Sequence, residues 1–158
     1  MVGRARRGLS LKDRAATPIT GDVMDRSIPS ARPTLLIADD DPVLRRTIGA
    51  LVARSFDVIG LAADAEEAIA LALLHSPDVA LVDVQMPGGG GLHATEHIAV
   101  HSPCTAVVIL SGDEEHSAVL ELLAAGAVSY LRKGGSVDEL VQRLRVSIDA
   151  HAALAPTI

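Results

Sequence analysis

The sequence predicts an α/β protein built on a five-stranded parallel sheet with helices on both faces. From Thr34 onward, apolar segments of strand length alternate with segments of helical periodicity. The strand segments are mostly apolar, and the first, LLIA, has no polar residue to mark a solvated face, which is typical of parallel strands buried between helices. Capping residues, prolines and glycines separate consecutive segments. These observations indicate five strand–helix units in one domain.

The expected strands are short apolar runs, each ended by a polar or turn-forming residue. The first stops at three aspartates, and the third stops at Met-Pro and four glycines. In chain order they are LLIA (35–38), DVIGLA (57–62), VALVDV (79–84), AVVIL (106–110) and VSYL (128–131).

The expected helices begin at residues that can accept hydrogen bonds from first-turn amides. Asp41 is an N-cap and Pro42 suits the first helical position. Capping boxes are indicated at Asp64–Glu67 and at Ser136–Glu139, and Ser111 with Glu114 has the same S-x-x-E pattern. The expected helices run over about 42–54, 64–75, 92–101, 114–125 and 136–150.

Composition narrows the functional classes. The 158 residues carry a formal net charge of -6 and 49% hydrophobic residues, which excludes a fully disordered chain and disfavours a nucleic-acid binder. A single cysteine excludes a disulfide scaffold and a four-cysteine zinc site, and suits the cytoplasm. No apolar run approaches the roughly 20 residues of a membrane helix, so no membrane association is expected.

The charge divides the chain into two unlike parts. Residues 1–33 carry a net charge of +4 with no sustained periodicity, whereas residues 34–158 carry -10. We expect a flexible basic N-terminal extension over 1–33, a folded domain over 34–150 and a short tail over 151–158. The extension could bind an acidic partner as a basic arm. Alternatively, translation could start at Met24, with residues 1–23 an over-extended reading frame.

Chemistry is expected where the strands end. In open α/β sheets, ligands bind beyond the carboxyl ends of the strands, and the residues there are Asp39, Asp40, Asp83, Ser111 and Lys133. Three converging carboxylates must hold either a proton or a cation. Oxygen ligands suit Mg²⁺, and a phosphoryl group would satisfy the metal, the ammonium and the hydroxyl, with a carboxylate as nucleophile.

Four ordered motifs resemble the response-regulator receiver domain, the phospho-acceptor module of two-component signalling. The resemblance covers about 34–150 and implies a flavodoxin-like or CheY-like sheet with strand order 2-1-3-4-5. The motifs are LLIADDDP (35–42), DVALVDVQMPGGGGL (78–92), VVILSG (107–112) and AAGAVSYLRK (124–133).

The resemblance implies a role for each matching residue. Asp83 would be the phosphorylated aspartate. Asp40 would ligate Mg²⁺ directly and Asp39 largely through water, and the backbone carbonyl of Gln85 would be a further ligand. The phosphate contacts and the switch would fall to three further residues: Ser111 would bond a phosphoryl oxygen, Lys133 would pair with the phosphate, and Tyr130 would change rotamer with phosphorylation.

Two departures from the family pattern leave local geometry open. Lys133 is followed by Gly134-Gly135 where the family usually has proline, often in a cis bond, so the conformation of the Lys133–Gly134 bond is open. The loop at 88–91 is four glycines without the usual acidic residue, and we expect it to be mobile. Neither departure removes a chemical group, so phosphorylation competence is retained.

Several residues also have simpler interpretations. Ser111 could only cap a helix, and Tyr130 could simply be a core residue. His93, His97 and His101 recur every four residues on one helical face; they could bind a transition metal, but a solvated face without acidic neighbours is the more common arrangement. Cys104 is expected to be a small core residue at the start of a strand.

The leading functional hypothesis is a stand-alone receiver, phosphorylated on Asp83 with Mg²⁺ by a histidine kinase or a histidine phosphotransfer protein. No DNA-binding or enzymatic output domain is expected, so output would run through a partner protein, with the receiver a monomer or weak homodimer. The main alternative is a receiver-fold interaction module that acts without phosphorylation. A phosphohydrolase would need a second acid where Gln85 stands, and a DNA-binding regulator would rest only on residues 1–33.

Overall fold

A computed structural model describes residues 31–112 and 116–154 of the chain. Most of the expected basic extension, including Met24, and the last four residues of the expected tail lie outside these ranges. Glu114, the expected capping partner of Ser111, lies outside them as well.

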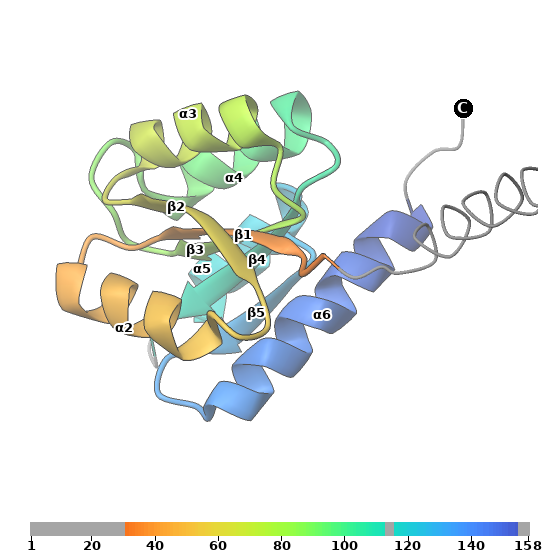
Figure 1. Ribbon diagram of the computed structural model, residues 1–158. Helices are drawn as coiled ribbons and strands as arrows, with labels where there is room; N and C mark the ends of the chain where they lie inside the picture. The colour runs from red at the N-terminus through yellow and green to blue at the C-terminus, as the bar shows by residue number, and fades with distance from the viewer. Residues whose placement is uncertain (1–30, 113–115, 155–158) are drawn as a thin grey trace, which may run out of the picture. The chain divides into compact units, whose positions relative to one another are not determined.

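The described residues form the predicted five-stranded parallel sheet with helices on both faces (Figure 1). The strand order is β2-β1-β3-β4-β5, which confirms the expected order. The strands are β1 (Thr34–Ala38), β2 (Asp57–Ala62), β3 (Val79–Asp83), β4 (Ala106–Ser111) and β5 (Ser129–Arg132). The helices are α2 (Pro42–Val52), α3 (Ala65–His75), α4 (Gly90–His101), α5 (His116–Ala124) and α6 (Val137–Leu154).

Alternate residues of each central strand enter opposite halves of the core. In β1, Leu36 and Ala38 pack on the side of α3, α4 and α5, whereas Leu35 and Ile37 pack on the side of α2 and α6. Figure 1 shows these two helical layers above and below the sheet. Because the central strands β1, β3 and β4 are covered on both faces, their sequences read as continuous apolar runs.

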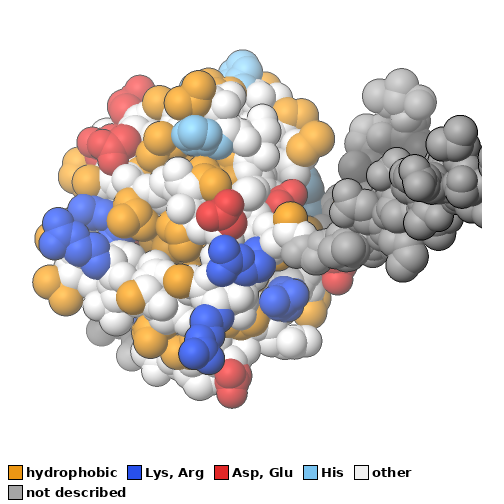
Figure 2. Space-filling model, viewed as in Figure 1, with side chains coloured by type: hydrophobic (Ala, Val, Ile, Leu, Met, Phe, Trp, Pro, Cys, Tyr) orange, Lys and Arg blue, Asp and Glu red, His pale blue; other side chains and the backbone are white. Residues whose placement is uncertain are grey.

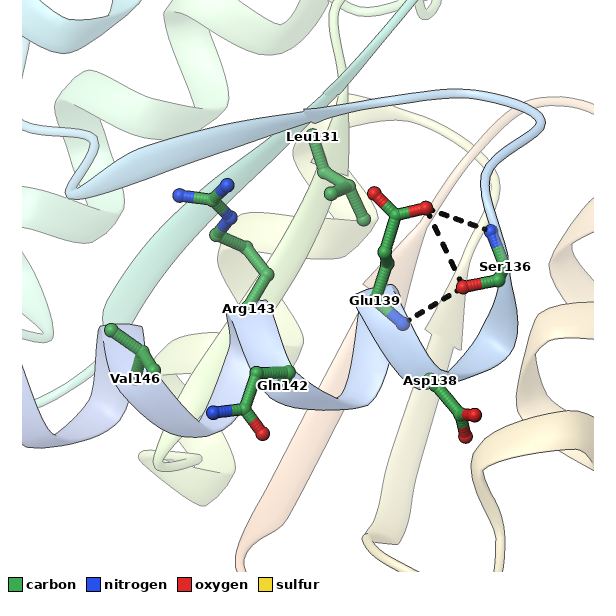
Figure 3. A pocket seen from close by; sticks show the side chains of 7 residues that line it. All are labelled: Leu131, Ser136, Asp138, Glu139, Gln142, Arg143 and Val146. Carbon is green, nitrogen blue, oxygen red and sulfur yellow. Dashed lines mark hydrogen bonds between the residues drawn. The ribbon is translucent and has the colours of Figure 1, made fainter.

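Helix capping follows the sequence closely. The Asp41 side chain accepts hydrogen bonds from the amides of Val43 and Leu44, and Asp64 accepts one from Glu67 at 2.8 Å. At the start of α6, the Ser136 Oγ accepts a bond from the Glu139 amide at 3.1 Å, and the Glu139 carboxylate accepts one from the Ser136 amide at 3.3 Å. Figure 3 shows this reciprocal pair, which confirms the expected capping box.

The α2, α4 and α6 helices each differ from the prediction at one end, and α2 ends at Val52 rather than near residue 54. The α4 helix begins at Gly90 rather than near residue 92, because glycines 90 and 91 themselves form its first turn. The α6 helix continues to Leu154 rather than ending near residue 150, since the intervening alanines and histidine contain no helix breaker. The sequence leaves the conformation of the Lys133–Gly134 bond open; the bond is trans, and Gly134 has a positive φ of 91°.

Candidate functional site

The acidic residues lie where the strand order of the sheet reverses. Ala38 of β1 pairs with Val82 of β3, so Asp39 and Asp83 leave two adjacent strands at the same edge of the sheet. Chain connections run in opposite directions on either side of this strand pair, and open α/β sheets bind ligands at that point. Asp39 and Asp83 are both buried, whereas Asp40 is exposed.

Lys133 and Ser111 reach the same edge from the neighbouring strands. The Lys133 amide donates a hydrogen bond to the Ser111 carbonyl at 2.8 Å, which holds the residue just after β5 beside the end of β4. The Lys133 Nζ lies 2.9 Å from Asp83 Oδ1 and 3.8 Å from Asp39 Oδ2. Ser111 is buried at the end of β4, in the strand next to Asp83. The structure therefore brings the five predicted strand-end residues to one edge of the sheet.

Asp39 is held in place by its backbone and by one of its two carboxylate oxygens. Its Oδ1 accepts a hydrogen bond from the Asp41 amide at 2.9 Å, and its carbonyl accepts one from Arg45 Nη1 at 2.6 Å. Its Oδ2 is buried and has no hydrogen-bond partner. A buried carboxylate oxygen is normally satisfied, so this atom indicates a place for a cation or its water.

Burial raises the pKa of Asp83 from 3.8 to about 6. The hydrogen bond and the positive charge of Lys133 act in the opposite direction, and the negative charges of Asp39 and Asp40 add to the increase. The carboxylate of Asp83 is therefore costly to ionise in this site unless further positive charge is supplied.

The donor set fits a hard divalent cation. Asp39, Asp40 and Asp83 each offer a carboxylate oxygen, and these atoms lie within 4.8 Å of one another. Oxygen-only ligands in this number suit Mg²⁺ with several waters retained. Gln85, exposed two residues after Asp83, lies in the adjacent loop; the role of its carbonyl as a ligand remains a prediction.

Tyr130 is not a core residue, so the simpler interpretation of this side chain is wrong. It is 46% exposed on β5 and lines a pocket of about 300 Å³ together with Ser111, Gly112 and Arg132. The far side of the pocket is formed by α5, through His116, Val119, Leu120 and Leu123. The pocket thus extends from the end of β4, at the edge of the sheet that holds the aspartates, to the surface of α5.

Two expectations outside this edge are wrong. Cys104 is exposed and precedes β4; the buried residue there is Thr105, whose hydroxyl donates to the Pro77 carbonyl at 2.7 Å. The histidine face of α4 does have an acidic neighbour, because His93 Nε2 lies 2.8 Å from Glu66 Oε2 of α3. The sequence could not show this contact, since the two residues are 27 positions apart.

Sequence reasoning also missed the contribution of Arg45 to the acidic edge. Its bond to the Asp39 carbonyl joins α2 to the end of β1. An arginine in the first turns of a helix has many possible partners, so the pattern carried no signal for this one.

Comparison with known proteins agrees with this geometry. The family model described as "Response regulator receiver domain" matches residues 35–145. The chain is 35% identical over 126 residues to the response regulator GacA of Pseudomonas aeruginosa, covering 78% of this chain and 59% of GacA. It is 30% identical over 131 residues to the transcriptional regulatory protein PdtaR of Mycobacterium tuberculosis, covering 82% of this chain and 63% of PdtaR.

A solved structure gives the same result for the fold. The signal receiver domain of NarL from Mycobacterium tuberculosis superposes with a TM-score of 0.72 at 28% identity, covering 76% of this chain and 98% of that domain. The chain spans about three-fifths of the length of GacA and of PdtaR. Among the helices of residues 31–112 and 116–154, none has the length and hydropathy needed to cross a membrane.

Proposed function

The chain belongs to the response-regulator receiver family, and from this premise we propose that Asp83 accepts a phosphoryl group from a histidine kinase or a histidine phosphotransfer protein. The observation that supports this proposal most directly is the position of the Asp83 carboxylate, 2.9 Å from Lys133 and within the cluster formed with Asp39 and Asp40. A nucleophile, a fixed ammonium and cation ligands are the groups that phosphoryl transfer to a carboxylate requires.

Mg²⁺ would be held by Asp39, Asp40, Asp83 and the Gln85 carbonyl, and it would neutralise charge on the transferring group. The buried Asp39 Oδ2, which has no hydrogen-bond partner, supports this assignment. In the transfer, an Asp83 oxygen forms the new bond to phosphorus while the bond from phosphorus to the donor breaks. Lys133 would remain beside the phosphorylated carboxylate, and the Ser111 hydroxyl would donate to a phosphoryl oxygen.

A direct test is labelling with a small-molecule phosphodonor such as acetyl phosphate in the presence of Mg²⁺, followed by intact-mass spectrometry. We expect one phosphoryl group on the native protein and none on Asp83→Asn. Asp57→Asn is a suitable control, because Asp57 is an exposed aspartate at the start of β2. Labelling of Asp83→Asn at the native level would reject the assignment.

We further propose that phosphorylation changes the surface formed by β5 and α5, and that a protein partner reads this change. Ser111 and Tyr130 line the same pocket, which supports a connection between the phosphorylation site and this surface. Tyr130 is the single tyrosine of a chain without tryptophan, so its fluorescence reports on this surface alone. Beryllofluoride with Mg²⁺ should change the emission of the native protein but not that of Asp83→Asn.

The same experiment addresses the alternative of an interaction module that works without phosphorylation. That module would show unchanged Tyr130 emission and unchanged partner affinity with beryllofluoride. Because the curated relatives are longer than the region they share with this chain, the stand-alone arrangement remains a prediction, and so does the absence of a DNA-binding domain.

A further inference from the structure

Three of the six histidines lie on one face of α4, with neighbouring rings close together and tilted. The ring centroids of His93 and His97 are 4.3 Å apart, and those of His97 and His101 are 6.0 Å apart. This spacing places successive imidazoles one helical turn apart. Figure 2 shows histidine and acidic side chains on the part of the surface over α3 and α4.

A carboxylate from a second helix meets this face. Glu66, in the first turn of α3, places its Oε2 2.8 Å from His93 Nε2. The side chain of His93 is 33% exposed and that of Glu66 is 70% exposed, so both remain accessible to a dissolved ion. The contact joins the adjacent helices α3 and α4 at the ends nearest the glycine loop.

The hydrogen bond of His97 engages one ring nitrogen and leaves the other available as a ligand atom. His97 Nδ1 lies 3.0 Å from the His93 carbonyl, which can only accept, so Nδ1 carries the proton and Nε2 keeps its lone pair. Histidines that ligate metals usually donate their other ring N–H to a carbonyl or carboxylate in this way. His93 donates from Nε2 to Glu66, so metal binding at that atom would move its proton to Nδ1 or to solvent.

The donor set differs from that of the aspartate cluster. Two imidazole nitrogens and one carboxylate suit a borderline transition-metal dication such as Zn²⁺, whereas oxygen-only ligands suit Mg²⁺. Ligand atoms about 2.0–2.1 Å from a tetrahedral Zn²⁺ are separated by roughly 3.3 Å, so the His93–Glu66 distance needs little adjustment. Among the described residues, only the aspartates hold three donor atoms within 4.8 Å, so a movement of the His97 side chain must complete the histidine site.

We propose that Glu66, His93 and His97 form a second metal site, which binds Zn²⁺ or a similar transition-metal dication between α3 and α4. The site adjoins the loop that follows Asp83. A Cβ on Gly89 would lie 2.7 Å from His93 Cβ, and one on Gly88 would lie 3.5 Å from the Glu66 amide. A bound metal therefore clamps both helices against this loop.

The test is calorimetric titration of the full untagged chain with ZnCl₂ in buffer that contains excess Mg²⁺, which competes with Zn²⁺ for the aspartate cluster. We expect one equivalent of Zn²⁺ to bind. Affinity should fall by about tenfold or more in each of His93→Gln, His97→Gln and Glu66→Gln. His75→Gln is the matched control, because His75 is an exposed histidine at the other end of α3 and should leave affinity unchanged.

Zinc binding should persist in Asp83→Asn, which separates this proposal from the phosphorylation of Asp83. Absence of Zn²⁺ binding in excess Mg²⁺ would overturn the proposal. Unchanged affinity in His93→Gln or His97→Gln would also overturn it, as would equal loss in His75→Gln. If Glu66→Gln retained its Zn²⁺ affinity while His101→Gln lost it, all the ligands would lie on α4. That result would overturn the proposed site between α3 and α4. Circular dichroism of each variant verifies that the fold is retained.

Discussion

At the residue scale, the burial of Asp83 sets its chemistry. The side chain lies at the end of a strand with no exposed residue, and its charge must be balanced within the site. Lys133 supplies one positive charge at 2.9 Å, but three carboxylates share that edge. The unliganded protein therefore holds an acidic site that favours a proton or a cation.

Replacing Asp83 by Asn should stabilise the metal-free protein at neutral pH. The pKa of Asp83 is raised to about 6 in the folded state, so the folded state binds more protons than the unfolded state between about pH 4 and pH 6. Stability is therefore lost as pH rises through this window, and Asn avoids that loss. With roughly 1.4 kcal/mol per pKa unit, we expect a gain of about 1–3 kcal/mol at pH 7.5.

Urea unfolding in EDTA at pH 4.5 and 7.5 measures this effect. The advantage of Asp83→Asn should be smaller at the lower pH. A destabilised variant at pH 7.5, or an advantage that grows toward low pH, would contradict the assigned cause.

At the scale of elements, the glycine loop is shaped by close packing. Gly88, Gly89 and Gly90 have φ values of 82°, 108° and 77°, which few other residues tolerate. Gly91 has a different constraint: a Cβ there would lie 2.5 Å from the Asp83 carbonyl oxygen and 3.0 Å from that of Val84. The start of α4 thus approaches the backbone of Asp83 itself. The mobility expected of this loop is not tested by these contacts and stays a prediction.

Gly91→Ala should destabilise the protein by about 1–3 kcal/mol, because backbone atoms must shift to admit the methyl group. Gly49→Ala is the matched control: its Cβ would meet only Leu61 and Ile37 side-chain atoms at 3.8 and 3.9 Å. Alanine in the middle of α2 should be neutral or stabilising by up to about 1 kcal/mol. Chemical denaturation of both variants provides the comparison, and equal effects would refute the packing argument.

The capping box of α6 makes an independent prediction. Ser136→Ala removes the acceptor for the Glu139 amide and should cost about 0.5–2 kcal/mol. Ser136→Asp retains a capping oxygen and should be close to the native stability. Thermal unfolding followed by circular dichroism distinguishes the two, and a neutral Ser136→Ala would show that this cap contributes little.

At the scale of the whole molecule, ligands of the acidic edge should act on global stability. Residues 34–158 carry a net charge of -10, and part of this charge is concentrated at one edge of the sheet. A cation that binds only the folded state stabilises it by mass action, by about 2.7 kcal/mol at a concentration of 100 times Kd.

MgCl₂ should therefore raise the unfolding temperature of the native protein. NaCl at matched ionic strength serves as the control for general screening. Asp39→Asn should lose most of the Mg²⁺-specific increase, because it removes the charge of the buried oxygen that has no hydrogen-bond partner. An Mg²⁺ effect that NaCl reproduces would argue against a metal site on these aspartates.

The predictability of this protein depends on the distance over which each interaction acts. Strand periodicity and helix caps are local, so the bounds of β2 and the N-caps at Asp41, Asp64 and Ser136 could be derived from short segments. The strand-end rule then placed Asp39, Asp83, Ser111 and Lys133 together, because the carboxyl ends of parallel strands meet at one edge.

The errors concern side chains whose surroundings come from distant segments. Cys104 is exposed ahead of β4, and the partner of His93 comes from α3. By itself the sequence determined the α/β architecture, the strand-end cluster and the family resemblance, since each arises from patterns along the chain. Only the tertiary structure decided that Lys133 contacts Asp83, that Tyr130 faces a pocket and that Glu66 meets the histidines, because these contacts join residues far apart in sequence.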